Sequence, residues 1–133
     1  MTAIASTIVE SETGYAQKIR AAGHELTADE AIAAGGTNTG PSPYALLLSA
    51  LGACTSITLR MYADRKGWTL GTIQIALRHS KSADGADHIE RDIRLGAPLS
   101  EEQRARIADI AEKTPVTKTL KAGATIATRL LDD

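Results

Sequence analysis

The sequence predicts an α+β fold with antiparallel β-sheets, helices lying on sheet, and one long central helix. Apolar residues recur at helical spacing over residues 43–66, and runs rich in β-branched residues stand before and after this stretch. The resulting order is three strands, the long helix, two strands, short helices and a last strand. A chain of 133 residues is about one domain long, so we expect a single domain over residues 1–133.

The first three strands are predicted at residues 3–10, 15–21 and 24–28. Polar turn residues follow the first strand, and Ala22 with Gly23 forms a tight turn between the second and the third. This pattern indicates a β-meander or a pair of hairpins. Residues 29–42 are rich in Gly and Pro and lead directly into the long helix, so we expect an ordered loop there.

The long helix has clear signals at both ends. Ser42 suits the N-cap and Pro43 the first helical position, while Gly67 is a natural stop. A helix over residues 43–66 would be roughly 36 Å long. Small residues widen its apolar face almost all round, which predicts burial on several sides. Its Ser, Thr and Arg content is too high for a membrane span.

Two alternating runs follow, at residues 70–79 and 88–95, and predict a hairpin with one solvated face. Ser100 opens the next helix, and Gln103 completes a capping box. Thr114 and Pro115 begin a short helical turn, in which Thr114 is a good N-cap. Residues 123–130 are predicted to form a last strand.

Composition excludes several functional classes. The net charge is −1 and the cations are scattered, so we expect no nucleic-acid partner. The first ten residues do not resemble a signal peptide, and a lone cysteine fits a reducing compartment; we therefore expect a cytoplasmic protein without a membrane partner. We expect no cofactor and no metal, because the three histidines lack ligand spacing. His79 and His88 are expected to face each other across the hairpin.

Cys54 is the only cysteine and the candidate catalytic residue. A thiol reacts as its thiolate, which a nearby cation or a helix N-terminus favours. Cys54 stands far from the start of its helix and among apolar neighbours, so activation would have to come from another segment or another subunit. The alternative is that Cys54 is inert packing, because free cysteines are often buried as small hydrophobes.

Two stretches resemble the OsmC/Ohr family, the osmotically inducible and organic hydroperoxide resistance proteins. The first covers residues 40–55 (GPSPYALLLSALGACT) and continues to Trp68; the second covers residues 114–120 (TPVTKTL). The element order matches over essentially the whole chain. The resemblance implies an OsmC-like fold and an intertwined homodimer, with sheets built from both chains and two long helices packed at its centre.

The resemblance also implies redox chemistry. In members with two cysteines, the first attacks an organic hydroperoxide and becomes a sulfenic acid, and the second resolves it as a disulfide that a lipoyl-type dithiol reduces. Cys54 matches the first cysteine, whereas Thr114 stands at the position of the second. Tyr44 stands where the reductase branch has a glutamate that holds an arginine over the sulfur. Arg20 is a candidate for that arginine, but we do not assign the role of the family's arginine to it.

Two functions follow from these observations. The first is a stress-response oxidoreductase, a one-cysteine peroxidase that reduces organic hydroperoxides at Cys54 with an external thiol as reductant. The second is a non-catalytic protein that binds a hydrophobic small molecule in a dimer-interface pocket. Tyr44 either lines that pocket or packs as a core aromatic. An arginine within hydrogen-bond reach of the Cys54 sulfur would favour the peroxidase hypothesis. Fully apolar surroundings of the sulfur would favour the binding-protein hypothesis.

Overall fold

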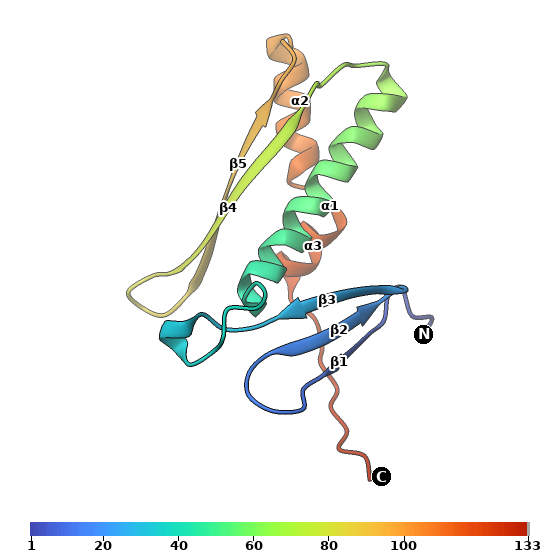
Figure 1. The fold of residues 1–133 in the computed structure, drawn as a ribbon. Coiled ribbons are helices and arrows are strands. Elements are labelled where there is room, and N and C mark those ends of the chain that lie inside the picture. The colour runs from blue at the N-terminus through green and yellow to red at the C-terminus, as the bar shows by residue number, and fades with distance from the viewer. Residues whose placement is uncertain (133) are drawn as a thin grey trace. The chain divides into compact units, whose positions relative to one another are not determined.

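A computed structural model describes residues 1–132 and confirms the α+β class (Figure 1). Two compact units divide the chain, Met1–Ser49 and the part from Ala50 onward, and the division falls within the long helix. The expectation of one domain over residues 1–133 stays a prediction. The elements are β1 (Thr7–Glu10), β2 (Gln17–Ala21), β3 (His24–Ala28), η1 (Ile32–Ala34), α1 (Pro43–Lys66), β4 (Ile73–Lys81), β5 (Asp87–Leu95), α2 (Glu101–Ala111) and α3 (Pro115–Ala122).

The first unit contains the predicted meander, an antiparallel sheet in the order β1–β2–β3 (Figure 1). Ala22 and Gly23 both have positive φ, 50° and 83°, which the two-residue turn of a right-twisted hairpin requires. β1 is shorter than predicted because Thr7 pairs with Ala21, the last residue of β2. The residues before Thr7 therefore have no partner on that strand.

The loop before α1 is ordered, as predicted, and one buried carboxylate organises it. Asp29 Oδ2 accepts hydrogen bonds from the hydroxyls of Thr37 (2.6 Å) and Thr39 (2.7 Å) and from both backbone N–H groups. Its Oδ1 accepts from the N–H of Glu30 at 2.7 Å. These bonds, led by those from the Thr37 and Thr39 hydroxyls, hold the pKa of Asp29 well below its usual range. The loop is therefore organised by hydrogen bonds to the ionised carboxylate of Asp29, and it leads into the first turn of α1.

Helix α1 begins and ends where the sequence predicts. Ser42 Oγ accepts from the N–H of Ala45 at 3.2 Å, which satisfies one of the free donors of the first turn. At the other end Gly67 has φ 69°, and the N–H of Trp68 donates to Ala63 at 2.9 Å. By length and composition alone this helix is able to cross a bilayer, a test that the core helix of a globular protein also passes. Five of its residues are buried, and two of them, Leu59 and Ala63, belong to the hydrophobic core cluster.

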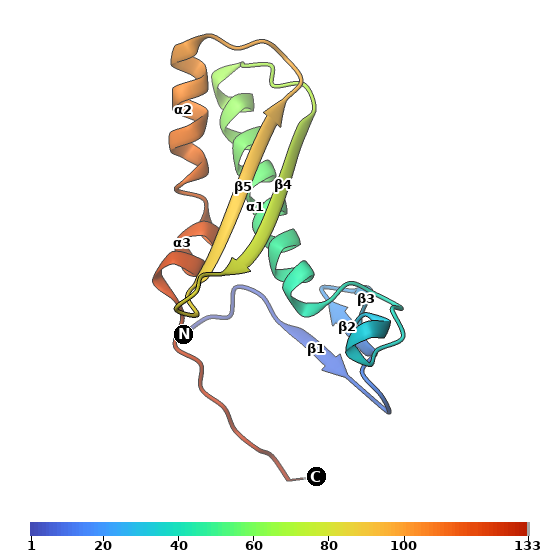
Figure 2. The ribbon, with the colours of Figure 1, turned by 90° about the vertical axis from the view of Figure 1, so that its left-hand side faces the viewer.

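The second unit packs the β4–β5 hairpin against α2 and the part of α1 from Ala50 onward (Figure 2). Its core cluster consists of Leu59, Ala63, Leu70, Ile107 and Ala111. Gly52 lies against the sheet so closely that a Cβ there would be 2.9 Å from Leu77 Cδ1. The hairpin alternates as predicted, with residues 89, 91, 93 and 95 half-buried and residues 90, 92 and 94 exposed.

The predicted strand over residues 123–130 is wrong. The chain after α3 has no regular secondary structure up to residue 132, and no strand of the described residues pairs with it. Ile126 and Leu130 are almost fully exposed in this segment. The strand-like pattern is present, but a strand also needs a hydrogen-bonded neighbour, and the described chain supplies none.

The expectation that α1 is buried on several sides is also wrong for the chain alone. The buried residues Leu51, Thr55 and Leu59 follow one stripe. The opposite stripe consists of Ala50, Cys54, Ile57 and Met61; Ile57 and Met61 are each 55% exposed, and Cys54 is half-buried. The helix thus has an apolar face that its own chain leaves uncovered.

Candidate functional site

The Cys54 thiol lies on α1 beside the first turn of α3. It is free and half-buried, and its sulfur accepts a hydrogen bond from the backbone N–H of Val116 at 3.5 Å. Within residues 1–132 no hydrogen bond joins a charged side chain to this sulfur. The polar contact on the sulfur therefore comes from the backbone at the start of α3.

Thr114, which the sequence resemblance aligned with a second cysteine, is completely buried immediately before α3. Its backbone is extended, as an N-cap requires, and its carbonyl accepts from the N–H of Lys118 at 3.0 Å. Thr114 is the N-cap residue of α3, as predicted, but its side chain makes no capping hydrogen bond, because Thr114 Oγ1 pairs with Thr117 Oγ1 at 2.6 Å. The Thr114 hydroxyl therefore belongs to a hydroxyl network at the start of α3.

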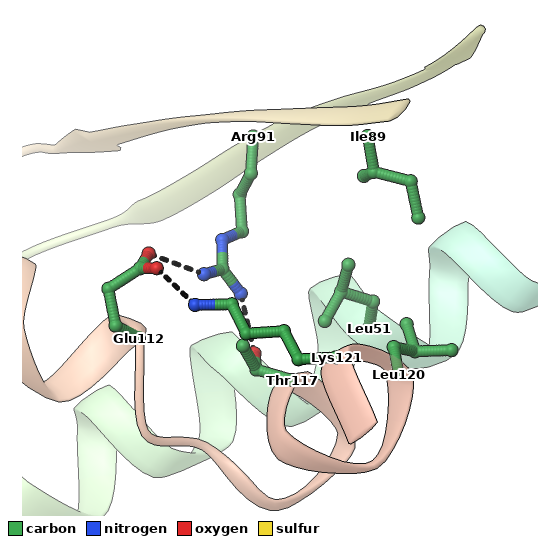
Figure 3. A pocket seen from close by; sticks show the side chains of 7 residues that line it. All are labelled: Leu51, Ile89, Arg91, Glu112, Thr117, Leu120 and Lys121. Carbon is green, nitrogen blue, oxygen red and sulfur yellow. Dashed lines mark hydrogen bonds and ion pairs between the residues drawn. The ribbon is translucent and has the colours of Figure 1, made fainter. Parts of the chain in front are cut away.

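Arg91 is the centre of that network, although the sequence pattern alone did not single it out. Its Nη1 donates to Thr55 Oγ1 at 2.9 Å and to Thr117 Oγ1 at 2.8 Å (Figure 3 shows the latter). Its Nη2 donates to the carbonyl of Ala111 at 3.0 Å and to Glu112 Oε2 at 3.1 Å. The side chain is only 11% exposed. One guanidinium thus ties α1, the end of α2 and α3 to β5.

A signal for Arg91 was present in the sequence. The alternation that places residues 89, 93 and 95 on the inner face of β5 places residue 91 there too. A cation at an inward position is costly unless it is paired, so it predicts partners on the elements that cover the sheet. The partners themselves lie 20 or more positions away in the chain, which no local pattern reveals.

A cavity of about 330 Å³ opens beside this network (Figure 3). It is lined by Leu51, Ile89, Arg91, Glu112, Thr117, Leu120 and Lys121, which come from α1, β5, α3 and the residue after α2. Lys121 Nζ contacts Glu112 Oε1 at 2.6 Å. The hydrogen bond from Lys121, followed by that from Arg91, lowers the pKa of Glu112. Cys54 does not line this cavity.

The other sequence candidates lie elsewhere. Tyr44 is in the first turn of α1 with an exposed side chain, and its role in a pocket stays a prediction. Arg20 forms an exposed ion pair with Glu10 at 3.1 Å.

The two histidines of the β4–β5 hairpin lie at different register positions. The hairpin register pairs His79 with Ile89 and His88 with Ser80, so the expectation that the two histidines face each other is wrong. They project from opposite faces because strand neighbours alternate. Within residues 1–132 no group of three or more His, Cys, Asp or Glu side chains is placed to hold a metal ion.

One comparison identifies a family for the chain, and another finds its fold among solved structures. A family model described as OsmC-like protein matches residues 36–129. No curated protein sequence is a significant match to the chain.

Solved structures share the fold at low sequence identity. An OsmC-like protein from Mycoplasma pneumoniae has 21% identity and a TM-score of 0.72, with 91% of this chain and 88% of that chain covered. The organic hydroperoxide resistance protein OsmC from Legionella pneumophila has 17% identity and a TM-score of 0.67, with 90% and 92% covered. The organic hydroperoxide resistance protein OhrB of Bacillus subtilis has 21% identity and a TM-score of 0.62, with 88% and 90% covered.

Proposed function

Because the chain belongs to the OsmC-like protein family, we propose that it is a one-cysteine, thiol-dependent peroxidase that reduces organic hydroperoxides at Cys54. The observation that carries the proposal is the hydrogen bond from the N–H of Val116 to the Cys54 sulfur at the start of α3. Two structural neighbours are named as organic hydroperoxide resistance proteins, which supports the same substrate class. A cytoplasmic location is part of the proposal, supported by the single unpaired thiol.

The proposed cycle uses one protein thiol and two external thiols. The Cys54 thiolate attacks the outer oxygen of the hydroperoxide, the O–O bond breaks, and the alkoxide leaves as an alcohol after taking a proton. Cys54 is then a sulfenic acid. An external thiol displaces water to form a mixed disulfide, and a second thiol releases the reduced protein and an external disulfide. Thr114 has no thiol that could attack the sulfenic acid, so a thiol from outside the chain must do so.

We expect Cys54→Ser to reduce hydroperoxide consumption to the rate without protein, because a hydroxyl does not ionise at neutral pH. The measurement is the consumption of cumene hydroperoxide with dithiothreitol or dihydrolipoamide as reductant. Ser49→Ala is the matched control, since Ser49 is an exposed residue of the same helix whose hydroxyl donates to the Ala45 carbonyl at 2.8 Å. Equal rates for wild type and Cys54→Ser would contradict the peroxidase proposal.

A second candidate is ligand binding without catalysis, in an apolar pocket at a dimer interface. It is favoured by the absence, within residues 1–132, of a charged side chain hydrogen-bonded to the Cys54 sulfur. It is also favoured by the replacement of the second cysteine by Thr114. The same assay separates the two candidates, because a binding protein gives no turnover in either form.

We also propose that the protein is a homodimer in which a second copy covers the exposed stripe of α1. Ala50, Cys54, Ile57 and Met61 follow one another at spacings of four, three and four, the pattern by which two helices pack along a seam. In the other unit, Val9, Ile19 and Leu26 form a cross-strand row whose outer members are exposed. Covering Ile57 and Met61 would remove apolar surface from water, and the partner would then complete the surroundings of Cys54.

Light scattering after size exclusion is expected to give about twice the chain mass of 14.0 kDa. Ile57→Glu is expected to shift the protein to the monomer, because a carboxylate would be buried without a partner. Arg104→Glu is the matched control, a charge change at an exposed position on α2. A wild-type protein that stays monomeric at high concentration would contradict the dimer.

A further inference from the structure

We propose that the cavity beneath β5 binds a small amphiphilic carboxylate, and that Glu112 holds the carboxylate position until the ligand displaces it. The cavity lies entirely within the second unit and does not include Cys54. The proposal therefore goes beyond peroxide reduction and does not depend on it.

The anion position is defined by two cations. Arg91 Nη2 contacts Glu112 Oε2 at 3.1 Å, and Lys121 Nζ contacts Glu112 Oε1 at 2.6 Å, so one carboxylate bridges both (Figure 3). A guanidinium and an ammonium around one carboxylate leave a local excess of positive charge. A carboxylate from outside would meet the same two donors in the same geometry.

The guanidinium of Arg91 is held in place, whereas the carboxylate of Glu112 can be displaced. Arg91 is held by the hydroxyls of Thr55 and Thr117 and by the carbonyl of Ala111, and its side chain is 11% exposed. The side chain of Glu112 is 58% exposed and stands just after the end of α2, so it can rotate into water at little cost. The Lys121–Glu112 pair is exposed on both sides and therefore contributes little net stability, so a competing carboxylate can take the place of Glu112 beside Lys121 and Arg91.

The walls of the cavity select the rest of the ligand. Leu51, Ile89 and Leu120 line it from α1, β5 and α3. Its volume of about 330 Å³ is at the lower end of the range for small-molecule pockets. An inorganic anion would leave these apolar walls in contact with water. The combination favours a carboxylate that carries a short alkyl or aryl body.

The test uses octanoate as the probe, with octanol and octylammonium as neutral and cationic probes of the same chain. Titration followed by amide chemical shifts is expected to show saturable octanoate binding that perturbs α3 and β5. Octanol and octylammonium are expected to bind at least about tenfold more weakly, because they lack the group that both cations recognise. Equal affinity for octanol would overturn the proposal, as would the absence of octanoate binding up to about 10 mM.

Three exposed positions sharpen the test. Glu112→Gln is expected to tighten octanoate binding about threefold to fivefold, because the competing charge is removed, and Lys121→Gln to weaken it by a similar factor. Lys118→Gln is the control, an exposed lysine of α3 that does not line the cavity. Unchanged affinity in Glu112→Gln and Lys121→Gln would overturn the proposal. Cys54→Ser is expected to bind octanoate like the wild type, so failure of the peroxidase assay and failure of this site are separate results.

Discussion

Replacing Arg91 by methionine is expected to lower the free energy of unfolding by about 2–4 kcal/mol, with a fall in the midpoint of thermal unfolding of roughly 10 °C. Methionine keeps most of the apolar length of the side chain but donates no hydrogen bond. The carbonyl of Ala111 and the hydroxyls of Thr55 and Thr117 would each lose a charged donor at a site that is only 11% exposed. The loss is large because these groups belong to three different helical segments.

The measurement is denaturant unfolding followed by circular dichroism. Arg78→Met is the matched control, since Arg78 lies on the outer face of the same hairpin, 52% exposed, and pairs with Glu90 and Asp92. Its removal is expected to have a much smaller effect, because solvent screens exposed ion pairs. If the two variants were equally stable, Arg91 would not be the structural centre that its contacts indicate.

Thr114→Cys is expected to convert the protein from external to internal resolution of the Cys54 sulfenic acid. The N–H of Val116 already contacts the Cys54 sulfur at 3.5 Å, so the first turn of α3 faces the thiol two positions from residue 114. One equivalent of hydroperoxide should leave a product lighter by two hydrogens and without free thiols. Resolution within the chain should be about 100-fold or more faster than attack by millimolar external thiol, because the attacking group is held in place.

Intact-mass spectrometry with thiol titration checks this expectation. Lys118→Cys provides the control, since it adds a second thiol at an exposed position of the same helix. That variant should gain oxygen at sulfur without forming the internal disulfide. If Thr114→Cys keeps one free thiol after one equivalent of hydroperoxide, and Cys54 then proceeds to the sulfinic acid, the proposed proximity is contradicted.

Local signals predicted the elements of this protein well. Ser42, Gly67 and the Ser100–Gln103 capping box set helix ends that the structure reproduces, because each acts within one turn of its own helix. Alternation located both strands of the β4–β5 hairpin for a similar reason.

The candidate site was predicted only in part. Cys54 was identified as the single cysteine and Thr114 through a resemblance to a family. The catalytic role of Cys54 and the part of Thr114 in the binding site stay predictions. Arg91 was missed because its role depends on hydrogen bonds to Thr55, Thr117 and the end of α2. These partners are distant in the sequence, and only tertiary packing brings them to Arg91. Sequence periodicity gives the face of a residue but not the identity of its neighbours.

The last strand failed for a different physical reason. Residues 123–130 have a pattern suited to a sheet, yet pairing requires an edge that the described chain does not offer them. Sequence periodicity is the same whether a strand pairs within its own chain or with another copy. The predicted burial of α1 on several sides fails in the same way, because Ile57 and Met61 have no cover in their own chain.

The exposed C-terminal segment has a kinetic consequence under the proposed dimer. Ile126 and Leu130 would reach their final burial only after two chains meet, so the last stage of folding would be a second-order reaction. Its rate would rise with protein concentration, whereas the rate at which each chain forms its own hairpins would not. At low protein concentration, a newly made chain would remain a monomer with these apolar side chains exposed to water. The lifetime of this monomer would determine the fraction of chains that aggregate before they dimerise.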